Sequence, residues 1–222
     1  MKLPLLVSFT LISSYAFAQE QDTCRNGLFP SYSDVQYAEI SSDHGRRVHF
    51  REDTKNCPES DTCQKKAYLV DGDKILIAQT TEQWACAWYF GKQQEFVGWL
   101  PRNAIKKLQL KSPTIQDWIG TWRPITGNNE IKIFRSKTGK LSASGIAYWY
   151  GGKNSYNTDI VHTGELGGEA APNGNKLTFG NKQEEYECAA DMQLVYGNLI
   201  VSDNGNCGGM NVRFDDVYRR RF

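Results

Sequence analysis

The sequence predicts an all-β fold, with a small barrel in the first half of the chain and an eight-stranded antiparallel barrel in the second half. Short apolar runs separated by Gly, Asn and Asp recur throughout, whereas apolar residues spaced for a helix face are hard to find. The chain of 222 residues is 40% hydrophobic and 12% aromatic. This composition can fill packed cores and excludes a disordered chain.

The first 18 residues have the pattern of a secretory signal peptide. Lys2 gives a basic start, residues 3–12 form an apolar stretch, and Ala16 and Ala18 are small residues before the expected cut. A membrane anchor is the alternative, but polar Ser and Thr interrupt the stretch, and no later segment has 18 consecutive apolar residues. We therefore expect cleavage after Ala18, a periplasmic or secreted protein, and no membrane span.

The cysteines predict three disulfides, because an even number of cysteines in an exported chain is typical of a disulfide framework. Zinc is the alternative, but five residues separate Cys57 from Cys63 and the three His residues are scattered, so we expect no metal and no cofactor. Among the first four cysteines three pairings are possible, of which we favour Cys57–Cys63 and Cys24–Cys86. The remaining two are Cys188 and Cys207.

The first half contains five strand-like runs, which predict a small barrel over residues 46–110 after an N-terminal arm over residues 19–45. A charged segment that ends at Pro113 follows, so we place the domain boundary near residue 112. The runs lie at 66–70, 74–78, 84–90, 96–101 and 104–108.

The order of motifs in this half is a Gly-Asp turn, a strand that begins with Trp, a Gly-Trp-Leu-Pro segment and a short last strand. The residues that carry it are Gly72, Asp73, Trp84, Gly98, Trp99, Leu100, Pro101 and Leu108. This order resembles a bacterial SH3-type domain. The resemblance implies a binding module, directed in many relatives at cell-wall peptides or protein partners, and makes Trp84, Trp88 and Tyr89 the candidate ligand contacts.

The second half, residues 114–222, contains eight strand-like runs, most of them separated by Gly, Asn or Pro. One pair can be tested by its register. A two-residue turn at Gly197-Asn198, with Gly suited to the first position of a type II′ turn, places Leu194 opposite Val201 and Cys188 opposite Cys207. This disulfide is expected to stabilise the fold by about 3 kcal/mol. The runs lie at 121–125, 130–136, 140–150, 159–170, 176–180, 186–196, 199–204 and 209–219.

The first and last strands of the second half each carry a residue that can pair with one in the other strand. Gly120 and Trp122 form a Gly-x-Trp motif at the first strand, and Arg219, or its neighbour Arg220, lies near the end of the last strand. This pairing resembles lipocalin-like barrels, in which the Arg side chain lies over the Trp ring and helps to close one end. Because the domain is shorter than most lipocalins, its interior can be packed rather than hollow.

Motifs that carry enzyme chemistry are missing. The sequence has no Gly-x-Ser-x-Gly, no His-Glu-x-x-His and no phosphate-binding Gly-rich loop, and every cysteine can be paired. His162 with Glu165 nearby could act as a base, but a surface His is the simpler interpretation. Residues 203–206 could bind calcium, but they also suit a plain β-turn. We therefore expect a protein that is not an enzyme.

The net charge excludes one class of ligand, and the aromatic residues indicate where a ligand can bind. The chain has 26 Lys and Arg against 25 Asp and Glu, which is too little positive charge for a general nucleic-acid binder. We expect Trp99 and Trp122 to lie in cores. In the segment around Trp149, neighbouring aromatic residues point to opposite faces, so at least one is available for contact, and Trp149 is our fourth candidate.

The sequence thus predicts a monomeric, non-catalytic periplasmic binding protein whose partner is a cell-envelope component or a periplasmic protein. A cell-wall peptide recognised by the SH3-like half is the first hypothesis. The second is an inhibitor of a cell-wall hydrolase, which predicts a loop that inserts into an enzyme cleft. The third is a carrier of a small lipophilic ligand, which needs an open cavity in the second barrel.

Overall fold

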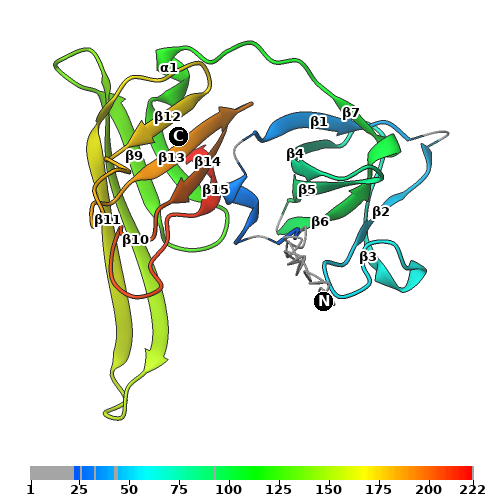
Figure 1. The fold of residues 1–222 in the computed structure, drawn as a ribbon, viewed down its shortest axis with the longest axis horizontal. Coiled ribbons are helices and arrows are strands. Elements are labelled where there is room, and N and C mark those ends of the chain that lie inside the picture. Colours follow the sequence, from blue (N-terminus) through cyan, green and yellow to red (C-terminus); the bar gives the residue numbers. More distant parts are fainter. Residues whose placement is uncertain (1–22, 26, 33, 43–44, 93, 222) are drawn as a thin grey trace, which may run out of the picture.

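The computed structural model describes residues 23–25, 27–32, 34–42, 45–92 and 94–221. The expected signal peptide lies outside these residues. Two β-sheets lie side by side, joined by a linker that runs from one to the other (Figure 1). No helix in the described part of the chain is long and apolar enough to cross a membrane.

The first sheet has seven strands among the described residues, all paired antiparallel in the order β3-β2-β6-β5-β4-β1-β7. Its interior is filled by apolar side chains that include Phe50, Leu69, Ile77 and Leu100. The strands are β1 (Gln36–Ile40), β2 (Val48–Arg51), β3 (Gln64–Leu69), β4 (Lys74–Thr80), β5 (Trp84–Phe90), β6 (Glu95–Pro101) and β7 (Ile105–Lys107), with short 3-10 turns η1 (Phe29–Ser31), η3 (Asp61–Cys63) and η4 (Arg102–Ala104).

Strands β1 and β2 were not among the expected runs. Strand β1 lies within the segment that we expected to be an arm, and it pairs with both β4 and β7. A five-residue strand flanked by polar residues gives little periodic signal, and its partners are distant in sequence. The expected arm is therefore partly a central strand of the first sheet.

The second sheet is a nearly closed antiparallel barrel of eight strands in the order β11-β10-β9-β8-β15-β14-β13-β12, which confirms the all-β prediction. Large side chains fill its interior, among them Trp118, Trp122, Phe179, Phe214 and Tyr218. After helix α1 (Ile115–Trp118), the strands are β8 (Gly120–Pro124), β9 (Glu130–Arg135), β10 (Leu141–Lys153), β11 (Asp159–Ala170), β12 (Lys176–Phe179), β13 (Ala190–Val195), β14 (Asn198–Asp203) and β15 (Asp216–Arg221).

The β13–β14 hairpin differs from the expected register by two residues. Leu194 pairs with Leu199, and the turn consists of Tyr196 and Gly197, whose φ angles of 48° and 74° are those of a type I′ turn. A shift of two residues keeps every side chain on its expected face, because the side-chain period of a strand is two. The Cys188–Cys207 disulfide is present as expected, although the turn was placed wrongly.

The barrel-closing pair involves Arg220 rather than Arg219. The guanidinium carbon of Arg220 lies 5.1 Å from the centre of the Trp122 ring, and the indole N–H donates to the carbonyl of Trp118 at 2.9 Å. Gly120 has a φ of 151°, and a Cβ at that position would lie 3.1 Å from the Arg220 side chain. Arg219 points out of the barrel instead, because adjacent residues of a strand face opposite sides.

Part of the outer face of β13–β15 is apolar, and this part is covered by the first half of the chain. Val195, Ile200 and Val217 pack with Phe29 and Trp88 in one buried cluster, which we call the inter-barrel core. The segment around η1 lies between the two sheets (Figure 1). An antiparallel sheet commonly packs one face on the core and exposes the other to water, whereas part of the outer face is an interface here.

Gln193 fixes the chain across this interface. Its buried side-chain amide accepts a hydrogen bond from the backbone N–H of Val35 at 3.0 Å and donates one to the Val35 carbonyl at 2.9 Å. A side chain thus pairs with a backbone segment as a neighbouring strand would, and no polar atom of this buried amide is left unsatisfied.

The remaining two disulfides pair as favoured from the sequence. Cys57–Cys63 closes a short loop before β3, and Cys24–Cys86 ties the N-terminal segment to β5 across 62 residues. Closing a loop of this length stabilises a fold by about 4 kcal/mol in the chain-entropy account. The Cys24–Cys86 bond therefore holds the segment that carries Phe29 and Val35 against the first sheet.

Candidate functional site

The three aromatic residues expected to form one ligand surface on the first sheet do not share a surface. Trp88 is 1% exposed and packs edge-on against Phe29, with ring centres 5.3 Å apart. It belongs to the inter-barrel core, so its burial contradicts a role as a ligand contact. Trp84 borders a small pocket at one end of the sheet, and Tyr89 borders a groove on another side. Trp84 and Tyr89 point to opposite faces of β5 because they are an odd number of residues apart.

The fourth candidate, Trp149, is half-buried on the long hairpin of the second barrel. Its ring centre lies 5.1 Å from that of His162. Tyr148 and Tyr150 lie on the other face with their rings stacked 6.2 Å apart, and Tyr150 is 57% exposed. The outward-facing contact candidate in this segment is therefore Tyr150.

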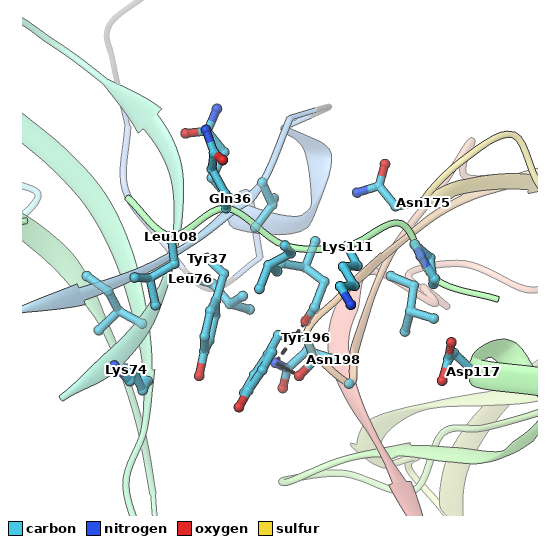
Figure 2. A pocket seen from close by; sticks show the side chains of 18 of the residues that line it. Gln36, Tyr37, Lys74, Leu76, Leu108, Lys111, Asp117, Asn175, Tyr196 and Asn198 are labelled. Atoms are coloured by element: carbon cyan, nitrogen blue, oxygen red, sulfur yellow. Dashed lines mark hydrogen bonds between the residues drawn. The ribbon is translucent and has the colours of Figure 1, made fainter. Parts of the chain in front are cut away.

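A groove of 1620 Å³ lies between the two barrels, beneath the linker that joins them. Figure 2 shows residues from both barrels and from the linker around it. Its lining combines aromatic rings, side-chain amides and more cations than carboxylates. The charged lining residues are Lys74, Lys107, Lys111, Arg219 and Arg220, with Asp73 and Asp117.

Two stacked tyrosines form part of the groove wall, one from each barrel (Figure 2). The rings of Tyr37 and Tyr196 are 4.2 Å apart at an angle of 23°. Tyr37 is 8% exposed, whereas Tyr196 is 65% exposed, so Tyr196 covers Tyr37 and presents its other side to solvent. Burial, with a further contribution from Tyr196, raises the pKa of Tyr37 to about 12, and its hydroxyl is neutral at physiological pH.

Tyr196 is held in an unusual backbone conformation. Its φ of 48° lies in the left-handed region, where Gly and Asn are the preferred residues. The side chain of Asn198 donates to the carbonyls of Val195 and Tyr196 at 3.1 and 3.2 Å, which fixes the turn. A large aromatic residue at a position that suits Asn or Gly makes the local backbone conformation less stable. Its presence there points to a function for the ring.

Beside the tyrosines, Arg219 lies over the ring of Phe90, with 4.0 Å from guanidinium carbon to ring centre. Two acidic residues stand behind it at the interface. Burial raises the pKa of Glu95, and burial raises the pKa of Asp216 to about 7, with a smaller contribution from Glu95. Burial shifts both carboxyl groups toward the neutral form, and neither of them lines the groove.

The hairpin of β10 and β11 extends well beyond the rest of the second barrel (Figure 1). Its turn is ordered by Asn154, whose side-chain oxygen accepts hydrogen bonds from the backbone N–H groups of Tyr156 and Thr158 at 2.9 and 3.0 Å. Tyr156 is 87% exposed at this turn. Sequence analysis did not single out Tyr37, Tyr156 or Tyr196. An aromatic residue within a run of Gly, Asn and Ser was the available signal for Tyr156.

The residues considered for other chemistry are engaged in structural contacts. His162 donates from Nδ1 to the carbonyl of Met210 at 2.8 Å, and Glu165 points to the opposite face of β11. The carboxylate of Asp203 accepts hydrogen bonds from the backbone N–H groups of Gly205 and Phe214. Within the described ranges, no group of three or more His, Cys, Asp or Glu side chains is placed to hold a metal ion.

Comparison with protein-family models, with curated proteins and with solved structures finds no match to this chain.

Replacing Asp216 by Asn should change how stability depends on pH. Because the pKa of Asp216 in the folded state is about 7, against an ordinary value of 3.8, the folded protein keeps a proton that the unfolded chain releases between roughly pH 4 and 7. The free energy of unfolding of the wild type therefore falls as pH rises through this window. The Asp216→Asn variant has no carboxyl group at this position, so its free energy of unfolding should not show this decrease. At pH 8 it should be more stable than the wild type by on the order of a few kcal/mol.

Urea denaturation at pH 4 to 8, followed by tryptophan fluorescence, measures this effect. Asp159→Asn removes one negative charge from the exposed end of the long hairpin and is the control for charge alone. If Asp216→Asn and the wild type show the same pH dependence, burial of Asp216 does not have the consequence stated here.

Proposed function

We propose that this protein is a non-catalytic binding protein of the periplasm or cell exterior, and that it recognises a component of the cell envelope in the groove between its barrels. The observation that carries the proposal is the Tyr37–Tyr196 stack in a groove of 1620 Å³. Three disulfides and the pattern of a signal peptide support an oxidising compartment.

The dimensions and lining of the groove support a polymer segment as the ligand. Its volume is larger than the roughly 300–1,000 Å³ of typical small-molecule pockets. The exposed side of Tyr196 offers a rigid apolar face against which a sugar ring or a peptide can pack. Five cations against two carboxylates in the lining favour a ligand that carries negative charge.

The packed second barrel does not support the carrier hypothesis. Side chains that include Trp122, Phe179 and Phe214, each 0% exposed, occupy the barrel interior. A lipophilic ligand would have to displace these rings, and core side chains pack at a density that leaves few voids. We therefore place the binding site outside the barrel.

Purified sacculi, the isolated cell-wall polymer, test the proposal directly. The full-length mature protein should sediment with sacculi at low and moderate salt. Tyr196→Asn should reduce the retained fraction at least about tenfold, since loss of a central aromatic contact commonly costs more than about 1.4 kcal/mol of binding. Asn suits the type I′ turn, so this variant removes the ring and keeps the backbone.

The matched control is Tyr186→Asn, which removes a tyrosine that is 83% exposed and does not border the groove. It should bind as the wild type does. Absence of retention of the wild type, or equal loss in both variants, would contradict the proposed site.

A second candidate function is inhibition of a cell-wall hydrolase by the long hairpin. The specific observation is Tyr156, almost fully exposed on an ordered turn at the end of a projecting two-stranded ribbon. The turn sequence combines Gly, Asn, Ser and Tyr, the residue types that binding loops use for rigid aromatic contact and adaptable hydrogen bonding. Such a shape fits a concave cleft.

Lysis of bacterial cells by lysozyme tests this second candidate. The wild-type protein should slow the loss of turbidity, Tyr156→Ala should abolish most of the effect, and Tyr186→Ala and Tyr196→Asn should retain it. Lysis at an unchanged rate in the presence of the wild type would exclude lysozyme as a target of the hairpin.

A further inference from the structure

A separate pocket of 340 Å³ lies at one end of the first sheet, away from the inter-barrel groove. It is formed by the segment before β2, by β2 itself, by the first residue of β5 and by the end of β6 with η4. Its lining includes three arginines, Arg46, Arg47 and Arg51, and the apolar residues Trp84, Pro101 and Ala104.

The charge of this pocket has one sign. Three arginines border it, and none of its described lining residues is Asp or Glu. The backbone carbonyl of Arg46 accepts a hydrogen bond from the Ser42 hydroxyl at 3.0 Å, but its guanidinium has no hydrogen-bond or ion-pair partner among the residues that the structure describes. The guanidinium of Arg47 lies over the ring of Tyr68, 4.4 Å from the ring centre. Two exposed guanidinium groups thus stand at the rim without a carboxylate partner in the described part of the chain.

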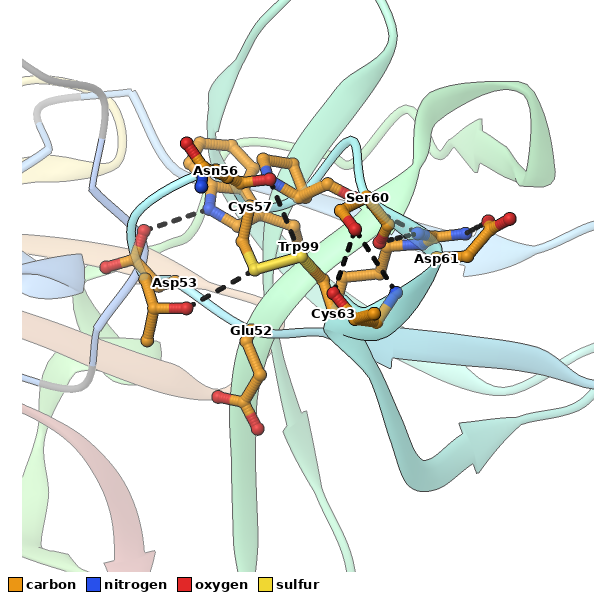
Figure 3. The surroundings of a disulfide bond; sticks show 12 residues. Glu52, Asp53, Asn56, Cys57, Ser60, Asp61, Cys63 and Trp99 are labelled. Carbon is orange, nitrogen blue, oxygen red and sulfur yellow. Dashed lines mark hydrogen bonds and ion pairs between the residues drawn. A yellow bond between two sulfur atoms is a disulfide. The ribbon is translucent and has the colours of Figure 1, made fainter.

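Arg51 brings a third positive charge into a more buried position. Its side chain is 18% exposed, and its Nη1 donates to the carbonyls of Ser60 and Pro58 at 2.7 and 3.2 Å. Both carbonyls belong to the loop that the Cys57–Cys63 disulfide closes (Figure 3). Carbonyl acceptors orient the guanidinium but do not neutralise it.

The acid nearest to Arg51 compensates its charge only weakly. Asp61 lies 3.7 Å from Nη2 and is fully exposed, so water screens the pair. The guanidinium carbon also lies 5.0 Å from the centre of the Trp84 ring. A mostly buried cation with a distant, solvated partner favours binding of an external anion.

Part of the remaining wall of the pocket is apolar, and the other lining residues are polar: Ser41, Ser42, His49, Gln64 and Asn103. Trp84, Val48, Pro101 and Ala104 offer a surface for a small hydrocarbon group next to the arginines. We propose that this pocket binds the C-terminal carboxylate of a peptide, with the arginines on the carboxylate and the apolar wall on the last side chain. A phosphate ion satisfies the arginines but has no group to place on the apolar wall. This site is independent of the groove proposed above.

Isothermal titration calorimetry of the full-length mature protein with N-acetyl-Ala-Ala tests the assignment. The free acid should bind, and the C-terminal amide of the same dipeptide should bind at least tenfold more weakly, since it lacks the charge. The double substitution Arg46→Gln with Arg47→Gln should weaken binding of the acid at least tenfold. Both residues are exposed, so the variant keeps the fold.

The matched control is Lys137→Gln with Lys140→Gln, which removes the same total charge from an exposed turn of the second barrel. It should bind the acid as the wild type does, and so should the groove variant Tyr196→Asn. No binding of the acid, or equal binding of acid and amide, would overturn the proposal. Inorganic phosphate that binds as tightly as the peptide acid would show a general oxyanion site and would overturn the peptide assignment.

Discussion

The packing of the N-terminal segment between the two barrels is the contact on which the rest of the structure depends. Val195, Ile200 and Val217 face out of the second barrel, and without a cover they would form an apolar patch in water. Burial of side chains of this size contributes about 1.5–3 kcal/mol each. Phe29 and Trp88 supply the cover, and the Cys24–Cys86 disulfide keeps it in place.

This contact also determines where binding surfaces can exist. The groove is formed from both barrels, so its shape is defined only when the inter-barrel core fixes their relative position. The Tyr37–Tyr196 stack then closes over one side of that junction. A wall held in this way loses little conformational freedom when a ligand binds, which favours affinity.

The groove, the arginine pocket and the long hairpin belong to one molecule but differ in their surface chemistry. The groove combines aromatic rings with a surplus of cations, the arginine pocket combines cations with a small apolar wall, and the hairpin presents a single exposed tyrosine. An envelope polymer that carries both saccharide and peptide can contact the first two at once. Two sites on one body raise the overall affinity without any new contact, provided the ligand spans both.

Much of the fold follows from local sequence patterns. Each of the eight runs expected in the second barrel overlaps one strand, because alternating hydrophobicity and turn residues are local signals. Two of these strands begin later than expected: β13 at Ala190 rather than at 186, and β15 at Asp216 rather than at 209. All three disulfides pair as favoured from the sequence. The hairpin turn lies one residue earlier than expected and the pairing register is shifted by two, because a tyrosine in the left-handed region is a position that sequence preferences argue against. Which of Arg219 and Arg220 faces Trp122 is set by the pairing of β15 with β8, in which Arg220 lies opposite Trp122.

The candidate site was less accessible to sequence reasoning. Tyr89 borders the groove and Trp84 borders the arginine pocket, but Trp88 is buried. The apolar part of the outer face of β13–β15 looked like an ordinary exposed side, because its cover, Phe29 and Trp88, comes from residues more than 100 positions away in the chain. Contacts between elements so distant in the chain leave no periodic signature, and the groove that they create leaves none either.

Hydrogen exchange measured by mass spectrometry at increasing urea concentrations tests the shared core most directly. If one core joins the two barrels, peptides from β4–β6 and from β13–β15 should lose their slowest-exchanging protection in one transition, with the same free energy of opening. Protection that disappears from the two barrels at clearly different urea concentrations would show that they do not share a core. The two barrels would then be independent units, and the groove would have no fixed shape.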